Sequence, residues 1–147
     1  MELVIASETK LYRQGNVDST VLVQSVIRVM LLEWQSEVFF LKKKAIAIIQ
    51  FMGLGYVSEK CLGHKKAHFK RELLGFVEEA FAFFQKKIEK QLDRWSAVLI
   101  AEGNPLEVEL EEIQAMQQEW QGLKQKFRQV EMRIMQGLFQ HYPIKII

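Results

Sequence analysis

Apolar residues recur at spacings of three and four along three long stretches of the chain, which is the period of an α-helix. The last stretch, from about Leu106 to Gln140, has one apolar stripe on an otherwise polar helix. The stripe consists of Leu106, Leu110, Ile113, Trp120, Leu123, Phe127, Val130, Ile134 and Leu138. This pattern is typical of a helix that packs against its neighbours along a single face.

The two earlier stretches carry more apolar surface than one face can hide. The stretch from about Thr20 to Phe51 is apolar around most of its circumference. The stretch from His64 to about Ala101 has a main stripe through Phe81 and Ile88 and a second one, the Phe stripe, formed by Phe69, Leu73, Phe76, Ala80 and Phe83. The N-terminal segment, a second copy of the chain or an apolar ligand must cover this surplus. A twofold contact is the commonest solution, so we predict a homodimer that associates through the Phe stripe.

Glycine, proline and capping residues separate these stretches. Ser58 can cap a short turn that ends at Gly63, and Gly103-Asn104-Pro105 can end one helix and start the next. The remaining signals are Gly15-Asn16, Asp18, Ser19, Gly53, Gly55 and Pro143. Short connections favour antiparallel neighbours. The prediction is an all-α protein, an antiparallel up-and-down bundle of three long helices plus a short N-terminal helix, forming a single domain over residues 1–147.

Composition places this bundle in the soluble, intracellular class. The chain is 49% hydrophobic and 26% charged, which excludes an intrinsically disordered protein. A single cysteine, Cys61, cannot form an internal disulfide, and the N-terminus lacks the basic region of a signal peptide. The longest uncharged apolar stretch, Ala45–Val57, has 13 residues and is too short to span a bilayer. We therefore expect a cytoplasmic protein.

Charge is distributed unevenly along the chain. Residues 42–71 contain eight Lys or Arg and one acidic residue, Glu59, whereas residues 102–119 contain six Glu and no Lys or Arg. A hairpin that turns about residue 56 would bring Lys42 level with Lys70. We therefore predict a basic collar that binds an acidic partner, formed by Lys42, Lys43, Lys44, Lys65, Lys66, Lys70 and Arg71. The other interpretation of these residues is a solvated end of the helices.

Within the collar lies the apolar segment Ala45–Val57. An apolar surface surrounded by lysines fits an acidic amphipathic helix or an anionic membrane surface. The other interpretation of this segment is a capped part of the core. The sequence pI of about 8.6 is modest and no exposed aromatic residues alternate with the basic ones, so we expect no nucleic acid partner.

One group of residues resembles a metal site in its spacing. His64, His68 and Glu72 would share one helix face, and two imidazoles at positions i and i+4 can bind one Zn²⁺ ion. Cys61 could join them only if the chain before His64 turned back. Lys65, Lys66 and Lys70 would repel a cation, so we expect neither a metal nor another cofactor.

No motif in the chain indicates catalysis. P-loop, dinucleotide, nucleophile-elbow and EF-hand patterns are missing from the sequence, as is the Glu-x-x-His pair of di-iron bundles. We expect a non-enzymatic adaptor or chaperone-like assembly factor with a basic tip for an acidic protein partner. The alternative is a protein that binds an apolar ligand or an anionic membrane surface through the basic tip and the Phe stripe.

Overall fold

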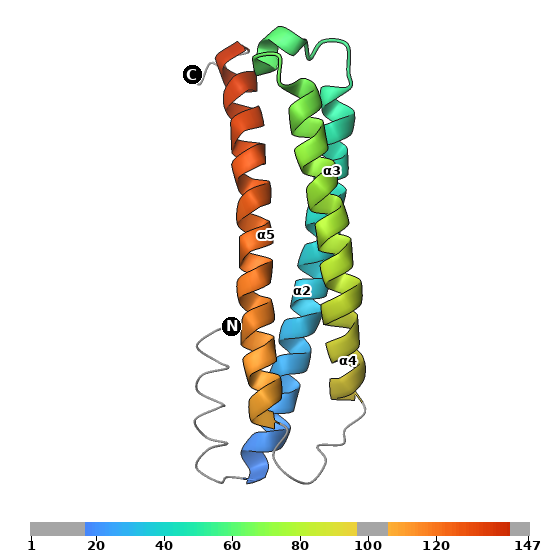
Figure 1. The fold of residues 1–147 in the computed structure, drawn as a ribbon, viewed down its shortest axis with the longest axis vertical. Helices are drawn as coiled ribbons and strands as arrows, with labels where there is room; N and C mark the ends of the chain where they lie inside the picture. Colours follow the sequence, from blue (N-terminus) through green and yellow to red (C-terminus); the bar gives the residue numbers. More distant parts are fainter. Residues whose placement is uncertain (1–16, 97–105, 142–147) are drawn as a thin grey trace, which may run out of the picture. The chain divides into compact units, whose positions relative to one another are not determined.

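The computed structural model describes residues 17–96 and 106–141, and this part of the chain is helical with no strand. The elements in chain order are α2 (Val17–Met52), the 3₁₀ turn η1 (Glu59–Leu62), α3 (Lys66–Phe83), the π-helical turn η2 (Phe84–Ile88), α4 (Glu89–Ser96) and α5 (Leu106–His141) (Figure 1). The predicted N-terminal helix lies outside the described residues.

The three long helical stretches agree with the sequence pattern. The predicted helix from Thr20 to Phe51 corresponds to α2, and the one from Leu106 to Gln140 corresponds to α5. The expected turn at Ser58 is also confirmed, because the Ser58 hydroxyl accepts a hydrogen bond from the Cys61 backbone N–H. The stretch predicted as one helix from His64 onward begins instead at Lys66 and contains a π-helical turn between α3 and α4.

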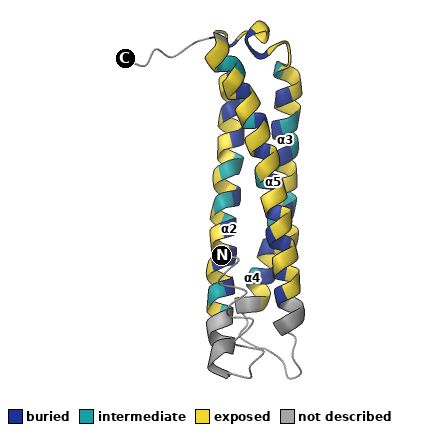
Figure 2. Cartoon of the chain, turned by 90° about the vertical axis from the view of Figure 1, so that its left-hand side faces the viewer, coloured by how far each residue is buried: buried dark blue, intermediate teal, exposed yellow. Residues whose placement is uncertain are grey.

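The helices form two compact units. Among the described residues, the first unit comprises residues 17–38, 82–96 and 106–120, and the second comprises residues 39–81 and 121–141. Both α2 and α5 contribute to each unit, because each helix continues past the boundary. Buried and exposed side chains alternate around each helix at the expected period (Figure 2).

The core of the first unit is built around Trp120. Its indole is fully buried, stacks on the Phe83 ring at a centroid distance of 5.6 Å and donates its N–H to Glu37 Oε2 at 2.6 Å. The surrounding buried side chains include Ile27, Met30, Leu31, Trp34, Val38, Ile88, Leu110, Ile113 and Met116. Aromatic stacking adds a specific geometry to the burial of apolar area.

The core of the second unit is built from the Phe stripe as far as Ala80 and from the C-terminal half of α5, while Phe83 belongs to the first unit. Phe76 and Phe127 lie with their ring centroids 5.0 Å apart. Leu73 and Ala80 from the Phe stripe and Ile134 from the stripe of α5 are also buried. Within this unit Lys42 of α2 contacts Phe81 of α3, and Lys44 of α2 pairs with Glu131 of α5. The helix α3 runs antiparallel to both α2 and α5, and α2 and α5 run parallel to each other (Figure 1).

The π-helical turn η2 interrupts the regular spacing of buried residues. Phe83 is buried before the turn, and Ile88 and Gln91 are buried after it. A regular helix would place residue 87 rather than residue 88 on the buried face, so the turn accommodates one additional residue.

Candidate functional site

The connection between α2 and α3 is held in a defined conformation by local contacts. Gly63 and His64 both adopt the left-handed conformation, with φ of 62° at each. The Lys66 ammonium group donates a hydrogen bond to the Val57 carbonyl oxygen at 2.7 Å. A Cβ atom added at Gly137 would lie 3.0 Å from the Cys61 carbonyl oxygen, so glycine allows η1 to approach α5 closely. Figure 1 shows this turn next to the end of α5.

Beside this connection, an apolar groove lies between α2 and α5 in the second unit. It has a volume of about 730 Å³ and is lined almost entirely by apolar atoms. The lining residues are Lys44, Ala47, Ile48, Phe51, Tyr56, Ile134, Met135, Leu138 and Phe139. Ile48 and Ile134 are buried, while Phe51, Tyr56, Met135 and Phe139 are exposed. The groove is therefore an open concave surface lined by exposed aromatic and Met side chains.

Two contacts fix the ends of this groove. The Phe51 and Tyr56 rings pack edge to face with centroids 5.6 Å apart. Lys44 Nζ lies 2.9 Å from Glu131 Oε2, which joins α2 to α5. The sequence indicates the α2 side of the groove through the apolar segment Ala45–Val57, but the α5 side was not predicted. Its signal is Met135 and Phe139, apolar residues that directly follow the stripe residues Ile134 and Leu138.

The residues of the predicted basic collar separate into two groups. Lys42 Nζ lies 4.7 Å from the centroid of the Phe81 ring, not level with Lys70. Phe81 and Lys70 are eleven residues apart, which corresponds to about 16 Å along the helix axis. The reason is the connection itself: α2 ends at Met52 and α3 starts at Lys66, with η1 between them, so the hairpin turns later than residue 56. Lys42–Lys44 and Lys65–Arg71 therefore do not form one ring.

The seven predicted residues also differ in what they contact. Lys42 lies over the Phe81 ring, Lys44 pairs with Glu131 and Lys66 binds the Val57 carbonyl, so these three have structural roles. The other four are exposed and form no ion pair within the described part of the chain: Lys43, Lys65, Lys70 and Arg71. These four basic side chains are the ones that a partner can reach without breaking an internal contact.

The charge of the chain follows the division into units. The described residues of the second unit include 12 Lys or Arg and five Asp or Glu, a formal net charge of +7. Those of the first unit include five basic and ten acidic residues, a net charge of −5. The apolar groove therefore belongs to the unit that attracts anions.

The Phe stripe is an interior surface. Phe69, Leu73, Phe76, Ala80 and Phe83 are all buried within the chain, and Phe76 and Phe83 pack on aromatic rings of α5. This corrects the expectation that the stripe lacks a partner within the chain, because α5 covers it. The apolar side chains that remain exposed lie elsewhere and include Phe40, of which 64% is exposed, Leu74 and Phe81. Self-association of the protein stays a prediction.

The residues with metal-ligand spacing do not share one helix face. His64 precedes α3 in a left-handed conformation, so only His68 and Glu72 are on the helix. His68 Nε2 lies 2.9 Å from Glu72 Oε1, and the Cys61 thiol faces the Gly137 carbonyl oxygen at 3.9 Å. Across residues 17–96 and 106–141, no three His, Cys, Asp or Glu side chains gather as a metal site would require.

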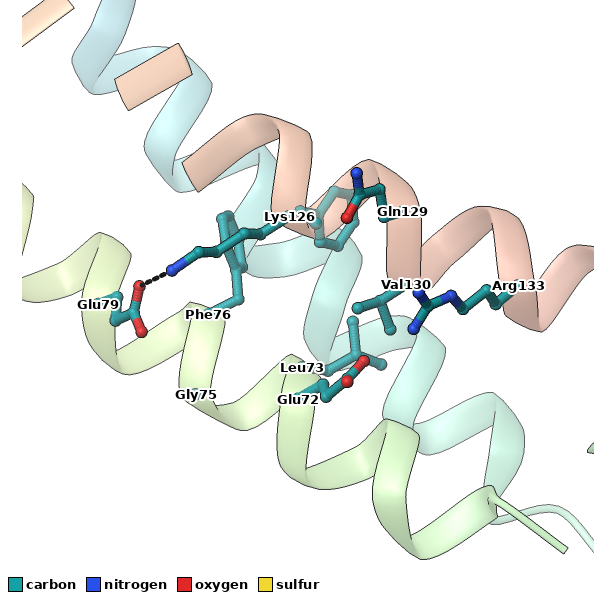
Figure 3. Close-up of a pocket in the computed structure, with 10 residues that line it drawn as sticks. Glu72, Leu73, Gly75, Phe76, Glu79, Lys126, Gln129, Val130 and Arg133 are labelled. Atoms are coloured by element: carbon teal, nitrogen blue, oxygen red, sulfur yellow. Dashed lines mark ion pairs between the residues drawn. The ribbon is translucent and has the colours of Figure 1, made fainter. Parts of the chain in front are cut away.

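Two smaller cavities have polar rims. One, of about 290 Å³, lies between α3 and α5 in the second unit, where Glu72 and Glu79 face Lys126 and Arg133 across an apolar floor (Figure 3). Lys126 Nζ lies 3.7 Å from Glu79 Oε2, so these charges interact with each other. The other, of about 230 Å³ in the first unit, is lined by Lys86, Lys87 and Lys90 opposite acidic residues of α5. The apolar groove is larger than either, and its one charged lining residue, Lys44, pairs with Glu131.

Comparison of the chain with family models, with curated protein sequences and with solved structures finds no match. Among the helices that the structure describes, none combines the length and the apolar character that crossing a membrane requires.

Proposed function

We propose that the protein is a non-enzymatic interaction protein, an intracellular adaptor or chaperone-like assembly factor, whose second unit binds an acidic protein partner. The observation that carries this proposal is the net charge of +7 on the described residues of that unit. Lys43, Lys65, Lys70 and Arg71 contribute to this charge from exposed positions. The proposal treats the chain as one antiparallel up-and-down bundle of three long helices.

Charge and apolar surface have separate roles in this proposal. A surface of one sign raises the association rate of an oppositely charged partner and orients it on approach. Burial of apolar area then supplies affinity, at roughly 25 cal/mol per Å² before the costs of association are subtracted. The second unit combines both features, since the apolar groove lies in the basic part of the chain.

The proposal is tested by native mass spectrometry of the gently purified protein, followed by binding measurements with the partner that co-purifies. A variant with Lys43→Glu, Lys65→Glu and Lys70→Glu should lose binding. A variant with Lys86→Glu, Lys87→Glu and Lys90→Glu changes the total charge equally but lies in the first unit, and it should bind normally. Binding should also weaken with salt, because the Debye length is about 8 Å at physiological ionic strength.

Two outcomes would contradict the proposal. Equal loss of binding in both variants would show that total charge matters and that the second unit has no special role. A purified protein that carries lipid and associates with anionic vesicles, but with no protein, would favour the alternative function, a binder of an apolar ligand or an anionic membrane surface.

A further inference from the structure

We propose that the apolar groove receives one amphipathic α-helix of a protein partner, with acidic side chains beside its apolar face. This inference rests on the proposed function, because it names the kind of segment through which the acidic partner would bind. On α2 the groove extends from Lys44 to Phe51, at positions 44, 47, 48 and 51. The separation of seven residues between positions 44 and 51 corresponds to about 10 Å along the helix axis.

The dimensions of the groove determine the spacing of the bound side chains. A helix lying along about 10 Å of groove presents two turns to it. Its contacting residues then have positions i, i+3 or i+4, and i+7, as in other helices that bind in grooves. Aromatic walls formed by Phe51 and Phe139, together with the flexible Met135, can adapt to Leu, Ile or Phe side chains of the partner.

A helix is the peptide conformation that fits a groove with so few polar atoms. The groove offers only Tyr56 and Lys44 as polar side chains, and Lys44 is already paired with Glu131. An extended peptide would bury backbone N–H and C=O groups without hydrogen-bond partners, which is costly. An α-helix satisfies these groups internally and buries only its side chains. The concave shape also favours an inserted helix over a flat membrane surface.

Charges beside the groove indicate which polar residues the bound helix carries. Lys43 and Lys44 lie on α2, and Arg128 on α5 precedes Met135 by seven residues, which places it on the same face of that helix. Glu131 is the acidic residue among them, and it pairs with Lys44. The remaining positive charge of Lys43 and Arg128 matches Asp or Glu residues on the flanks of an incoming helix.

The experiment uses two synthetic fluorescent peptides of about 18 residues, long enough to form a helix. The first has Leu at positions i, i+4 and i+7 with Glu on both flanks, and the second has the same composition with the Leu residues dispersed around the helix. Fluorescence anisotropy with the full chain should show that the patterned peptide binds at least about tenfold more tightly. Vesicles of equal parts phosphatidylserine and phosphatidylcholine serve as the membrane probe and should neither bind nor compete.

Two matched variants on α5 locate the binding site. Met135→Glu places a charge in the groove, whereas Met132→Glu places the same charge one turn earlier at a position that is 58% exposed and does not line the groove. We expect Met135→Glu to weaken binding of the patterned peptide by about tenfold or more and Met132→Glu by less than about twofold. Both variants should retain the helical circular dichroism spectrum of the parent protein, since both residues are exposed.

The inference is overturned if the dispersed peptide binds equally, if the two Met variants behave alike, or if the vesicles compete for the groove. Its failure is distinguishable from failure of the proposed function. If an acidic partner binds in a salt-dependent way that Met135→Glu does not affect, the proposed function stands and the groove is not the site. If the patterned peptide binds in the groove without any dependence on salt or on Lys43→Glu, the helix site stands and the acidic partner does not.

Discussion

Trp120 on α5 donates its indole N–H to the carboxylate of Glu37 on α2 at 2.6 Å, although the indole is completely buried. A buried donor without an acceptor costs about 1–3 kcal/mol. Glu37 therefore allows the Trp120 side chain to occupy the core of the first unit. Phe83 on α3 stacks on the face of the same ring, so three helical segments meet at one indole.

Replacing Glu37 should destabilise the protein by leaving this N–H unpaired. We expect Glu37→Leu to lower the free energy of unfolding by about 1–3 kcal/mol. Glu37→Gln should cost less, since it keeps an acceptor oxygen. Urea unfolding followed by circular dichroism measures the difference, and Glu33→Leu at an exposed position of α2 is the control. A loss no greater than that of the control would contradict the role of Glu37.

Two glycines of α5 should respond in opposite directions to alanine. A Cβ atom at Gly122 meets nothing within 4 Å, so Gly122→Ala should stabilise the helix by about 0.5–1 kcal/mol. A Cβ atom at Gly137 meets the Cys61 carbonyl oxygen at 3.0 Å and Leu62 Cδ2 at 3.1 Å, so Gly137→Ala should destabilise by about 1–3 kcal/mol. Thermal unfolding midpoints give the signs, and two stabilised variants would show that η1 does not pack on Gly137.

Because the Phe stripe is buried within the chain, replacing one of its residues should lower the stability of the fold rather than change the oligomeric state. Phe76→Ala should cost about 3–5 kcal/mol, because Phe76 is buried against Phe127. Phe40→Ala, at a position that is 64% exposed, should cost less than about 1 kcal/mol. Urea unfolding and light scattering on the same samples separate the two roles. If Phe76→Ala changed the molar mass while leaving the free energy of unfolding unchanged, the stripe would be an intermolecular surface.

Adjacent lysines at the start of α3 should differ in their effect on stability. Lys66 Nζ donates to the Val57 carbonyl oxygen, so Lys66→Met removes a hydrogen bond worth about 1 kcal/mol or slightly more. Lys65 is exposed and forms no such bond within the described residues, so Lys65→Met should change the free energy of unfolding by less than about 0.5 kcal/mol. For this reason the charge-reversal variant proposed above contains Lys65 and omits Lys66.

The sequence predicted the helices well because local residues specify where helices begin and end. Ser58 caps η1 through its hydroxyl, and Leu106 starts α5 directly after Pro105. The register between α2 and α3 was not predictable in the same way. It depends on how η1 folds and packs on Gly137, and this contact joins residues 76 positions apart.

The candidate site was predictable only in part, for the same reason. The basic residues and the apolar segment Ala45–Val57 are visible in the sequence, but the groove also needs Met135 and Phe139 from α5. Periodicity assigns residues to faces of one helix, while the choice of neighbouring face depends on long-range contacts such as Lys44 with Glu131. The burial of Phe76 follows from a similar long-range contact with Phe127.

The π-helical turn η2 gives the continuous helical segment α3–η2–α4 one residue more than a regular α-helix would need to keep its buried face. Counted from Phe83, an uninterrupted α-helix would bury residues 87 and 90, and the structure buries Ile88 and Gln91 instead. Deleting one of the residues 84–87, which precede the buried Ile88, would thus return the segment to regular α-helical geometry while keeping Ile88 and Gln91 in the interior. The chain can be shortened at this point without turning the buried face of the following helix toward solvent. A deletion in the middle of α2 or α5 would rotate the buried residues after it away from the core.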